Sequence, residues 1–256
     1  MEESKKEEKQ KRHEEEDHPL GKQGKKGEED EDDLVFWDPD LFLNQSYATR
    51  TFTFGEFSVD ILLSNAASTD YDLTGQVLWP AASYLSEYIV THQNMFHDKY
   101  VLEVGSGVGL CGLLAHKLSQ RCILTDHNDH VLELLQKNVD DHKAKEGQGR
   151  VLMVQKLEWG EGLEEFKASV PDLGQGFDVI IGSDVVYWPE CIEPLLRTVE
   201  ALLSPSADSV FILSYMSRAK NADALLHRLL EQYAFSTAVI RHENDVFLVE
   251  IRRARK

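Results

Sequence analysis

Apolar and polar residues alternate in two different patterns from residue 100 onward. Short apolar runs bounded by turn-forming residues are typical of buried strands, and longer segments with apolar residues at helical spacing are typical of amphipathic helices. The expected strands are YVLEV (100–104), RCILTD (121–126), VLMVQKL (151–157), a strand within FDVIIGSDVVY (177–187), SVFILSYM (209–216), FSTAVIR (235–241) and DVFLVEIRR (245–253).

The segments between these strands carry the helical pattern, which indicates a parallel sheet covered by helices on both faces. The expected helices are residues 109–119, 129–139, 191–203 (kinked or begun near Pro194) and 221–233. The last two strands are joined by a short turn at residues 242–244, so they must be antiparallel. The pattern therefore predicts an α/β fold with a doubly wound, mostly parallel sheet and an antiparallel C-terminal strand.

The segment before this alternation has a different organisation. Two β-rich runs flank Gly55 and Glu56 in YATRTFTFGEFSVDILLS, which predicts a β-hairpin. Residues 70–75 are expected to form a loop, and residues 80–90 a helix with proline in its first turn. We therefore expect an N-terminal hairpin and helix over residues 49–90, followed by a core over residues 98–256.

Residues 1–33 differ from the rest in composition. They contain almost no apolar residues but 14 acidic and 8 basic ones. Such a segment cannot bury enough apolar area to offset the entropy of ordering it, so a disordered charged tail is expected. The folded domain is then expected at residues 34–256, and it keeps a net charge of −12 out of −18.

The net charge limits the class of partner, and the cysteines indicate the redox environment. An acidic protein is a poor general nucleic-acid binder, because phosphate contacts need a basic face, but it suits a basic protein segment. We find no apolar run long enough for a membrane span and no apolar leader segment. The three scattered cysteines are expected to be reduced thiols of an intracellular protein, and no Cys/His cluster predicts a metal site.

The segment EVGSGVG joins the first strand of the alternating series to its first helix, and places glycine at positions 105, 107 and 109. In a doubly wound sheet this turn is where a nucleotide-like cofactor binds, because glycines let the backbone approach a ligand. A dinucleotide fingerprint would need glycine at position 110, which is Leu110. The alternative is a tight turn without a ligand.

Asp126 ends the next strand, at the same edge of the sheet. A carboxylate at this position can accept hydrogen bonds from both hydroxyls of a ribose. The alternative is that Asp126 caps the following helix, although Asp129 is equally able to do so.

Four motifs together resemble one enzyme family: TGQVLWP (74–80), EVGSGVG (103–109), LEWG (157–160) and SDVVY (183–187). The chain resembles the class I, seven-β-strand S-adenosylmethionine-dependent methyltransferases, and within them family 16, the methyltransferase-like protein-lysine methyltransferases. The resemblance covers about residues 49–252 and implies a Rossmann-like, seven-stranded sheet and S-adenosylmethionine as cofactor.

The resemblance also implies a role for individual residues. Gly105 and Gly107 would approach the methionine and ribose parts of the cofactor, with Glu103 supporting the loop. Asp126 would hold the ribose, and Trp159 would lie against the adenine. The remaining cofactor-side positions are Trp79, which would close the pocket, and Ser183, which would border it.

Asp184 and Tyr187 would be the catalytic residues, at the substrate entry. The Asp184 carboxylate could attract the lysine ammonium, or its backbone carbonyl could accept the amine, while Tyr187 and Trp188 offer apolar and π surface to the lysine stem. The structural alternatives are a helix cap or loop hydrogen bond for Asp184 and ordinary packing for the aromatic residues, including Trp159. The histidines of the helix after Asp126 are expected on a solvated face rather than at a metal: His127, His130 and His142.

The sequence thus predicts a protein N-methyltransferase acting on lysine in a non-histone protein. The alternatives are methylation of arginine, histidine or a small molecule, and a non-catalytic protein that binds the cofactor and a partner. The expected substrate is a protein with a basic segment, and the expected state is a monomer without nucleic-acid or membrane partners. The expected compartment is the cytoplasm, with the nucleus as the alternative.

Overall fold

The computed structural model describes residues 47–65, 71–146 and 149–254, all of which belong to one unit that spans residues 44–256. The predicted disordered tail at residues 1–33 lies outside the described residues. Among the described residues, none of the helices is both long and apolar enough to cross a bilayer.

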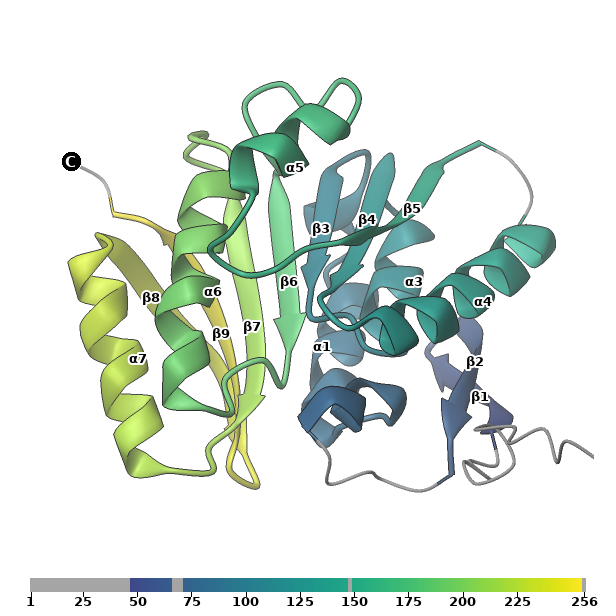
Figure 1. The fold of residues 1–256 in the computed structure, drawn as a ribbon, viewed down its shortest axis with the longest axis horizontal. Helices are drawn as coiled ribbons and strands as arrows, with labels where there is room; N and C mark the ends of the chain where they lie inside the picture. Colours follow the sequence, from purple (N-terminus) through teal and green to yellow (C-terminus); the bar gives the residue numbers. More distant parts are fainter. Residues whose placement is uncertain (1–46, 66–70, 147–148, 255–256) are drawn as a thin grey trace, which may run out of the picture. The chain divides into compact units, whose positions relative to one another are not determined.

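Within the described residues, the main sheet has seven strands in the order β5-β4-β3-β6-β7-β9-β8 (Figure 1). Strands β3 to β7 are parallel to one another, and β9 is antiparallel to both of its neighbours, β7 and β8. The strands are β3 Tyr100–Val104, β4 Arg121–Asp126, β5 Val151–Lys156, β6 Val179–Ser183, β7 Val210–Met216, β8 Phe235–Glu243 and β9 Val246–Arg253. The predicted α/β fold with an antiparallel C-terminal strand is confirmed.

Helices cover both faces of this sheet, as a doubly wound fold requires. Helices α6 and α7 lie on the near face in Figure 1, and α1 and α3 lie on the far face. The apolar residues of β3 alternate between the two cores, with Val101 in one and Leu102 in the other. The helices are α1 Pro80–Thr91, α2 Gln93–Phe96, α3 Leu110–His116, α4 Asp129–Glu146, α5 Leu163–Ser169, α6 Pro189–Leu202 and α7 Lys220–Gln232.

The N-terminal hairpin forms as predicted, with β1 (Tyr47–Phe54) and β2 (Phe57–Ser64) paired antiparallel around Gly55. One face of β2 is buried in the same core as α3 and α4. Asn138 of α4 fastens this strand, because its side chain accepts the N–H of Leu62 at 2.7 Å and donates to the Leu62 carbonyl at 3.0 Å. The hairpin is thus attached to the helix that follows β4.

Several predicted boundaries are wrong for identifiable reasons. The expected loop at 70–75 is a 3₁₀ helix, Tyr71–Gln76. Helix α4 continues past residue 139 to Glu146, and its last four residues, 143–146, have high helix propensity. Helix α6 begins at Pro189, which places Pro194 in its second turn rather than at its start.

The turn between β8 and β9 is tighter than expected. It consists of Asn244 and Asp245, both with positive φ (51° and 61°), instead of residues 242–244. Asparagine and aspartate tolerate this left-handed conformation, and two such residues make the turn that fits the twist of a hairpin.

Candidate functional site

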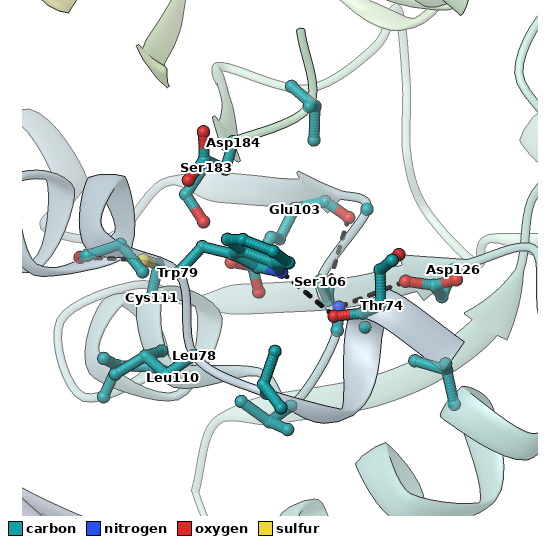
Figure 2. Close-up of a pocket in the computed structure, with 18 of the residues that line it drawn as sticks. Thr74, Leu78, Trp79, Glu103, Ser106, Leu110, Cys111, Asp126, Ser183 and Asp184 are labelled. Carbon is teal, nitrogen blue, oxygen red and sulfur yellow. Dashed lines mark hydrogen bonds between the residues drawn. The ribbon is translucent and has the colours of Figure 1, made fainter. Parts of the chain in front are cut away.

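One pocket lies at the carboxyl ends of the parallel strands, where β3, β4 and β6 lead into their following loops. All of the positions predicted from the sequence line it: Trp79, Glu103, Gly105, Gly107, Asp126, Trp159, Ser183, Asp184 and Tyr187. Figure 2 shows Asp126 at one side of this pocket and Ser183 and Asp184 at the other. The fold therefore brings together in one place residues that the sequence spreads over more than a hundred positions.

The glycines after β3 are needed both for backbone conformation and for space. Gly105 and Gly107 have φ of +61° and +52°, in the left-handed region that favours glycine. A Cβ on Gly105 would lie 2.8 Å from a Val185 methyl carbon and 3.1 Å from the Trp159 ring. A Cβ on Gly107 would lie 2.8 Å from the carbonyl oxygen of Gly75. The sequence predicted the close approach of this loop to a ligand but not its packing against Gly75.

Glu103 is buried at the end of β3, where its Oε2 accepts the N–H of Gly112 in α3 at 3.0 Å. Burial raises the pKa of this carboxyl group to about 8. Its main-chain oxygen accepts the Thr125 hydroxyl at 2.7 Å, and the Thr125 N–H in turn donates to the Ser106 hydroxyl at 3.0 Å. These contacts tie the glycine loop to both α3 and β4.

Asp126 is buried at the end of β4 and directs both carboxylate oxygens to backbone groups. Its Oδ2 accepts the N–H of Gly107 at 3.1 Å, and its Oδ1 accepts the N–H of His127 at 2.8 Å. The cap of α4 is neither Asp126 nor Asp129, because Asn128 Oδ1 accepts the His130 N–H at 2.9 Å. The competing explanation for Asp126 as the helix cap is therefore wrong, and its carboxylate remains at the pocket.

Two tryptophans form walls of the pocket. Trp79 is anchored within its own motif, since its Nε1 donates to the main-chain oxygen of Thr74 at 3.0 Å (Figure 2). Trp159 follows β5 and lies against the backbone of Gly105. Each ring is partly buried, so each has one face against the protein and another surface at the pocket.

Asp184, directly after β6, has a φ of +57°, which is uncommon outside glycine. Its N–H donates to the Ser214 carbonyl at 2.8 Å, so the strained residue is fastened to β7. Its side chain is 3% exposed, and its Oδ1 accepts the Met216 N–H at 3.1 Å and a hydrogen bond from Arg218 Nη1 at 2.8 Å. The structural alternative for Asp184, a loop hydrogen bond, is thus present alongside its place in the pocket.

Arg218 is the residue that sequence reasoning missed. Its guanidinium pairs with Asp184 and also lies over the Trp79 ring, 5.2 Å from the ring centroid. The only signal in the sequence is its position two residues after strand β7, at the edge where ligands bind in such sheets.

The aromatic residues predicted at the substrate entry lie next to each other. The Tyr187 and Trp188 rings meet edge to face, with centroids 5.8 Å apart. Tyr187 lines the pocket, whereas Trp188 directly precedes the first residue of α6 and is 46% exposed. The pair extends from the pocket to the surface.

The charges around the pocket have one sign. The lining carries the carboxylates of Asp126 and Asp184 and the imidazole of His127, and none of the described lysines or arginines lines it. The buried Glu103 carboxyl group, whose pKa is raised to about 8, is mostly protonated at neutral pH and adds little charge. Such a lining favours a cationic ligand over an anionic one.

The histidines after β4 differ from the expectation. His130 is exposed and His127 partly so, but His142 is buried on the inner side of α4, with its Nε2 3.1 Å from Nδ1 of the buried His116. Burial lowers the pKa of His142 to about 4. Its predicted place on a solvated face is therefore wrong, because α4 extends beyond residue 139. Within the part of the chain that the structure describes, there is no group of three or more potential metal-ligating side chains.

Comparison with known proteins identifies methyltransferases as relatives of this chain. A family described as lysine methyltransferase matches residues 62–232. The protein N-lysine methyltransferase METTL21A of Danio rerio is 30% identical over 170 residues, which is 66% of this chain and 73% of that protein. The histone-arginine methyltransferase METTL23 of Mus musculus is 32% identical over 161 residues, which is 62% of this chain and 59% of that protein.

Among solved structures, the 16S rRNA methyltransferase RsmC of T. Thermophilus, in complex with AdoMet and guanosine, superposes with a TM-score of 0.56. The match covers 81% of this chain and 50% of that one, at 14% identity. This likeness supports the fold.

Proposed function

The chain belongs to the lysine methyltransferase family, and we propose that it transfers the methyl group of S-adenosylmethionine to lysine in a non-histone protein. The observation that carries the proposal is the pocket itself, in which the glycine loop, the Asp126 carboxylate and the Asp184–Tyr187 segment meet under Trp79. Methyl transfer needs little chemical activation by the protein, so the main task of such a pocket is to position two reactants.

The residues at β3 and β4 fit the cofactor. A side chain on Gly105 would clash with Val185 and with the Trp159 ring, so glycine lets that ring lie against the loop at the pocket. Asp126 has lone pairs left on its carboxylate for ribose hydroxyls, because each oxygen that it directs to the backbone can accept a further hydrogen bond. When bound, S-adenosylmethionine supplies an electrophilic methyl group on a positively charged sulfur, which the carboxylate-rich lining suits.

The residues at β6 and β7 fit the acceptor. A free lysine side chain has a pKa near ~10.4 and must lose its proton before it can act as a nucleophile. The Asp184 Oδ1 accepts two hydrogen bonds, one from the Met216 N–H and one from Arg218, and its Oδ2 is buried, so the carboxylate is turned into the protein. We therefore assign the acceptance of the substrate amine to the main-chain oxygen of Asp184, and the enclosure of the lysine stem to Tyr187 and Trp188.

The acidic lining and the net charge of −18 support a substrate protein with a basic segment around its target lysine. They give no support to nucleic acid or an anionic membrane as the partner. We propose that the enzyme is a monomer that acts in the cytoplasm, with the nucleus as the alternative compartment. Light scattering of the purified full-length chain and imaging of a tagged chain in cells test these two points.

Arginine is the second candidate acceptor, because the METTL23 relative is named as a histone-arginine methyltransferase. The test uses extract from cells that lack this protein, incubated with the purified full-length chain and S-adenosylmethionine that carries a labelled methyl group. Mass spectrometry then maps the label. Label on lysine of non-histone proteins is expected, and label confined to arginine, histidine or small molecules would refute the lysine assignment.

A non-catalytic protein that only binds the cofactor and a partner makes a different prediction. In that case the wild type would add no label to the extract, although S-adenosylhomocysteine would still raise its melting temperature. An enzyme should show both effects.

A further inference from the structure

Arg218 connects two walls of the pocket that come from distant parts of the chain. Its Nη1 lies 2.8 Å from Asp184 Oδ1, in the loop after β6. The flat face of the same guanidinium lies over Trp79, immediately before α1, with 5.2 Å between the guanidinium carbon and the ring centroid. A planar guanidinium can pair with a carboxylate at its edge and stack on an aromatic ring with its face, which an ammonium cannot do.

The position of Arg218 indicates support rather than direct contact with the reactants. Trp79 and Asp184 line the pocket, but Arg218 does not. The Asp184 side chain is 3% exposed, whereas that of Arg218 is 31% exposed. The arginine thus lies behind the pocket wall, between the buried carboxylate and solvent.

Asp184 needs such support because of its backbone. Its left-handed conformation (φ +57°) is unfavourable for a residue with a side chain and persists only where surrounding contacts hold it. Its described contacts are the N–H bond to Ser214, the Met216 N–H and Arg218, and of these only Arg218 comes from a side chain. A buried carboxylate without its cation would also tend to move toward water.

We propose that Arg218 is a positioning residue of the methyl transfer, which clamps Asp184 and Trp79 so that the main chain of Asp184 receives the substrate amine in line with the methyl group. This inference rests on the proposed function. Trp79, the wall of the cofactor pocket that Arg218 touches, is also anchored by its own hydrogen bond to Thr74, and none of the clamp's contacts reaches the glycine loop or Asp126. Loss of the clamp should therefore slow transfer while cofactor affinity is preserved.

The test compares Arg218→Gln and Arg218→Lys with the wild type. Initial rates of label transfer are measured at saturating S-adenosylmethionine over a dilution series of extract from cells that lack the protein, and the affinity for S-adenosylhomocysteine is measured by calorimetry. Arg218→Gln should lower the maximal rate by about tenfold or more, and Arg218→Lys, which keeps the charge but not the flat face, by about threefold to tenfold. The affinity of both variants should stay within about threefold of the wild type.

Arg241→Gln is the matched control. Arg241 also lies over an aromatic ring, Tyr84, at 4.6 Å, and pairs with Glu87 and Glu243, but none of these residues lines the pocket. Its maximal rate should stay within about twofold of the wild type.

Three results would overturn the inference. One is a maximal rate of Arg218→Lys equal to that of the wild type. This result would refute the inference even if Arg218→Gln does not fold. Another is a faster Arg218→Gln enzyme, because the arginine would then compete with the substrate cation. The third is an equal loss in Arg218→Gln and Arg241→Gln. A wild type that transfers no label would instead overturn the proposed function, and this inference with it.

Discussion

The two sides of the pocket are built in different ways. On the cofactor side, most of the contacts join a backbone N–H to a side chain at or just after the end of a strand, such as the Gly107 N–H to Asp126, 19 positions apart in the chain. On the acceptor side, side chains from distant segments make them, such as Arg218 with Asp184, 34 positions apart, and Arg218 with Trp79. The first side depends on conformation, and the second depends on the identity of particular side chains.

This difference separates two kinds of defect. A change in the glycine loop alters the surface that holds the cofactor, so it should abolish cofactor binding and with it the methylation of any acceptor. A change at Asp184 or Arg218 alters how the acceptor is placed, so it should reduce transfer and spare the cofactor. An enzyme family can keep one cofactor and change its substrates if the two sides are separable in this way.

The largest effect is expected for Gly107→Ala. The new Cβ would lie 2.8 Å from the Gly75 carbonyl oxygen, and the residue would keep a φ of +52°. The glycine loop or the Gly75 segment must shift, and both line the pocket, so the affinity for S-adenosylhomocysteine, measured by calorimetry, should fall by more than about a hundredfold.

Gly55→Ala is the control, because Gly55 has a similar φ of +57° but no atom within 4 Å of its added Cβ. It should cost about 1 kcal/mol of stability and leave cofactor affinity unchanged. Equal loss of affinity in both variants would mean that backbone strain alone, and not the packing of the loop on Gly75, controls the pocket.

The next largest effect is expected when the two pocket carboxylates are replaced separately, in Asp126→Ala and in Asp184→Ala. Asp126→Ala removes charge-assisted hydrogen bonds to the loop and to the ribose, so cofactor affinity should fall by about tenfold to a hundredfold. Asp184→Ala should lower the rate of label transfer by at least about tenfold, with cofactor affinity within about threefold of the wild type. The comparison between the two sides fails if Asp184→Ala weakens cofactor binding as much as Asp126→Ala.

The same difference explains what the sequence could predict. The bounds of β3 and β4 match the predicted runs, because buried strands in a parallel sheet are short, continuous apolar segments ended by turns. The glycine loop and Asp126 could be located for the same reason, since they directly follow those strands. Helix α5 was missed because it buries only Phe166 and so carries no periodic pattern.

Contacts between segments that are distant in the chain could not be predicted from the amino-acid sequence alone. Nothing in the spacing of residues places Arg218 over Trp79, or Gly75 against Gly107. The same holds for His142, whose burial follows from packing against His116 of another helix. Periodicity reveals which face of an element is apolar, but it does not reveal which polar side chains find partners across the core.

A smaller effect is expected from Glu103, on the cofactor side, which should make the stability of the protein depend on pH. Burial raises the pKa of the Glu103 carboxyl group to about 8, from its ordinary value of 4.5. Between these values the unfolded chain is ionised while the folded protein holds the proton, so stability should fall as pH rises from about 4.5 to about 8. Glu103→Gln cannot ionise, so it should remove most of this loss, measured by urea unfolding without cofactor across the pH range. An unchanged slope in the variant would show that the carboxyl group is ionised in the folded protein.

The smallest effect is expected from His142, which contacts His116 at the end of α3 and changes stability with pH in the opposite direction. Burial lowers its pKa to about 4, from 6.5, so the unfolded chain binds the extra proton between these values. Stability should therefore be lost as pH falls from about 6.5 to about 4, and His142→Gln should remove most of that loss. His130→Gln is the control, because His130 is exposed on the same helix and its replacement should leave the profile unchanged. If both variants lose the pH dependence of stability below pH 6.5 equally, the buried pair with His116 is not its source. If only His142→Gln loses it, the loss of stability at acid pH comes from the core, and the loss at alkaline pH comes from the cofactor side.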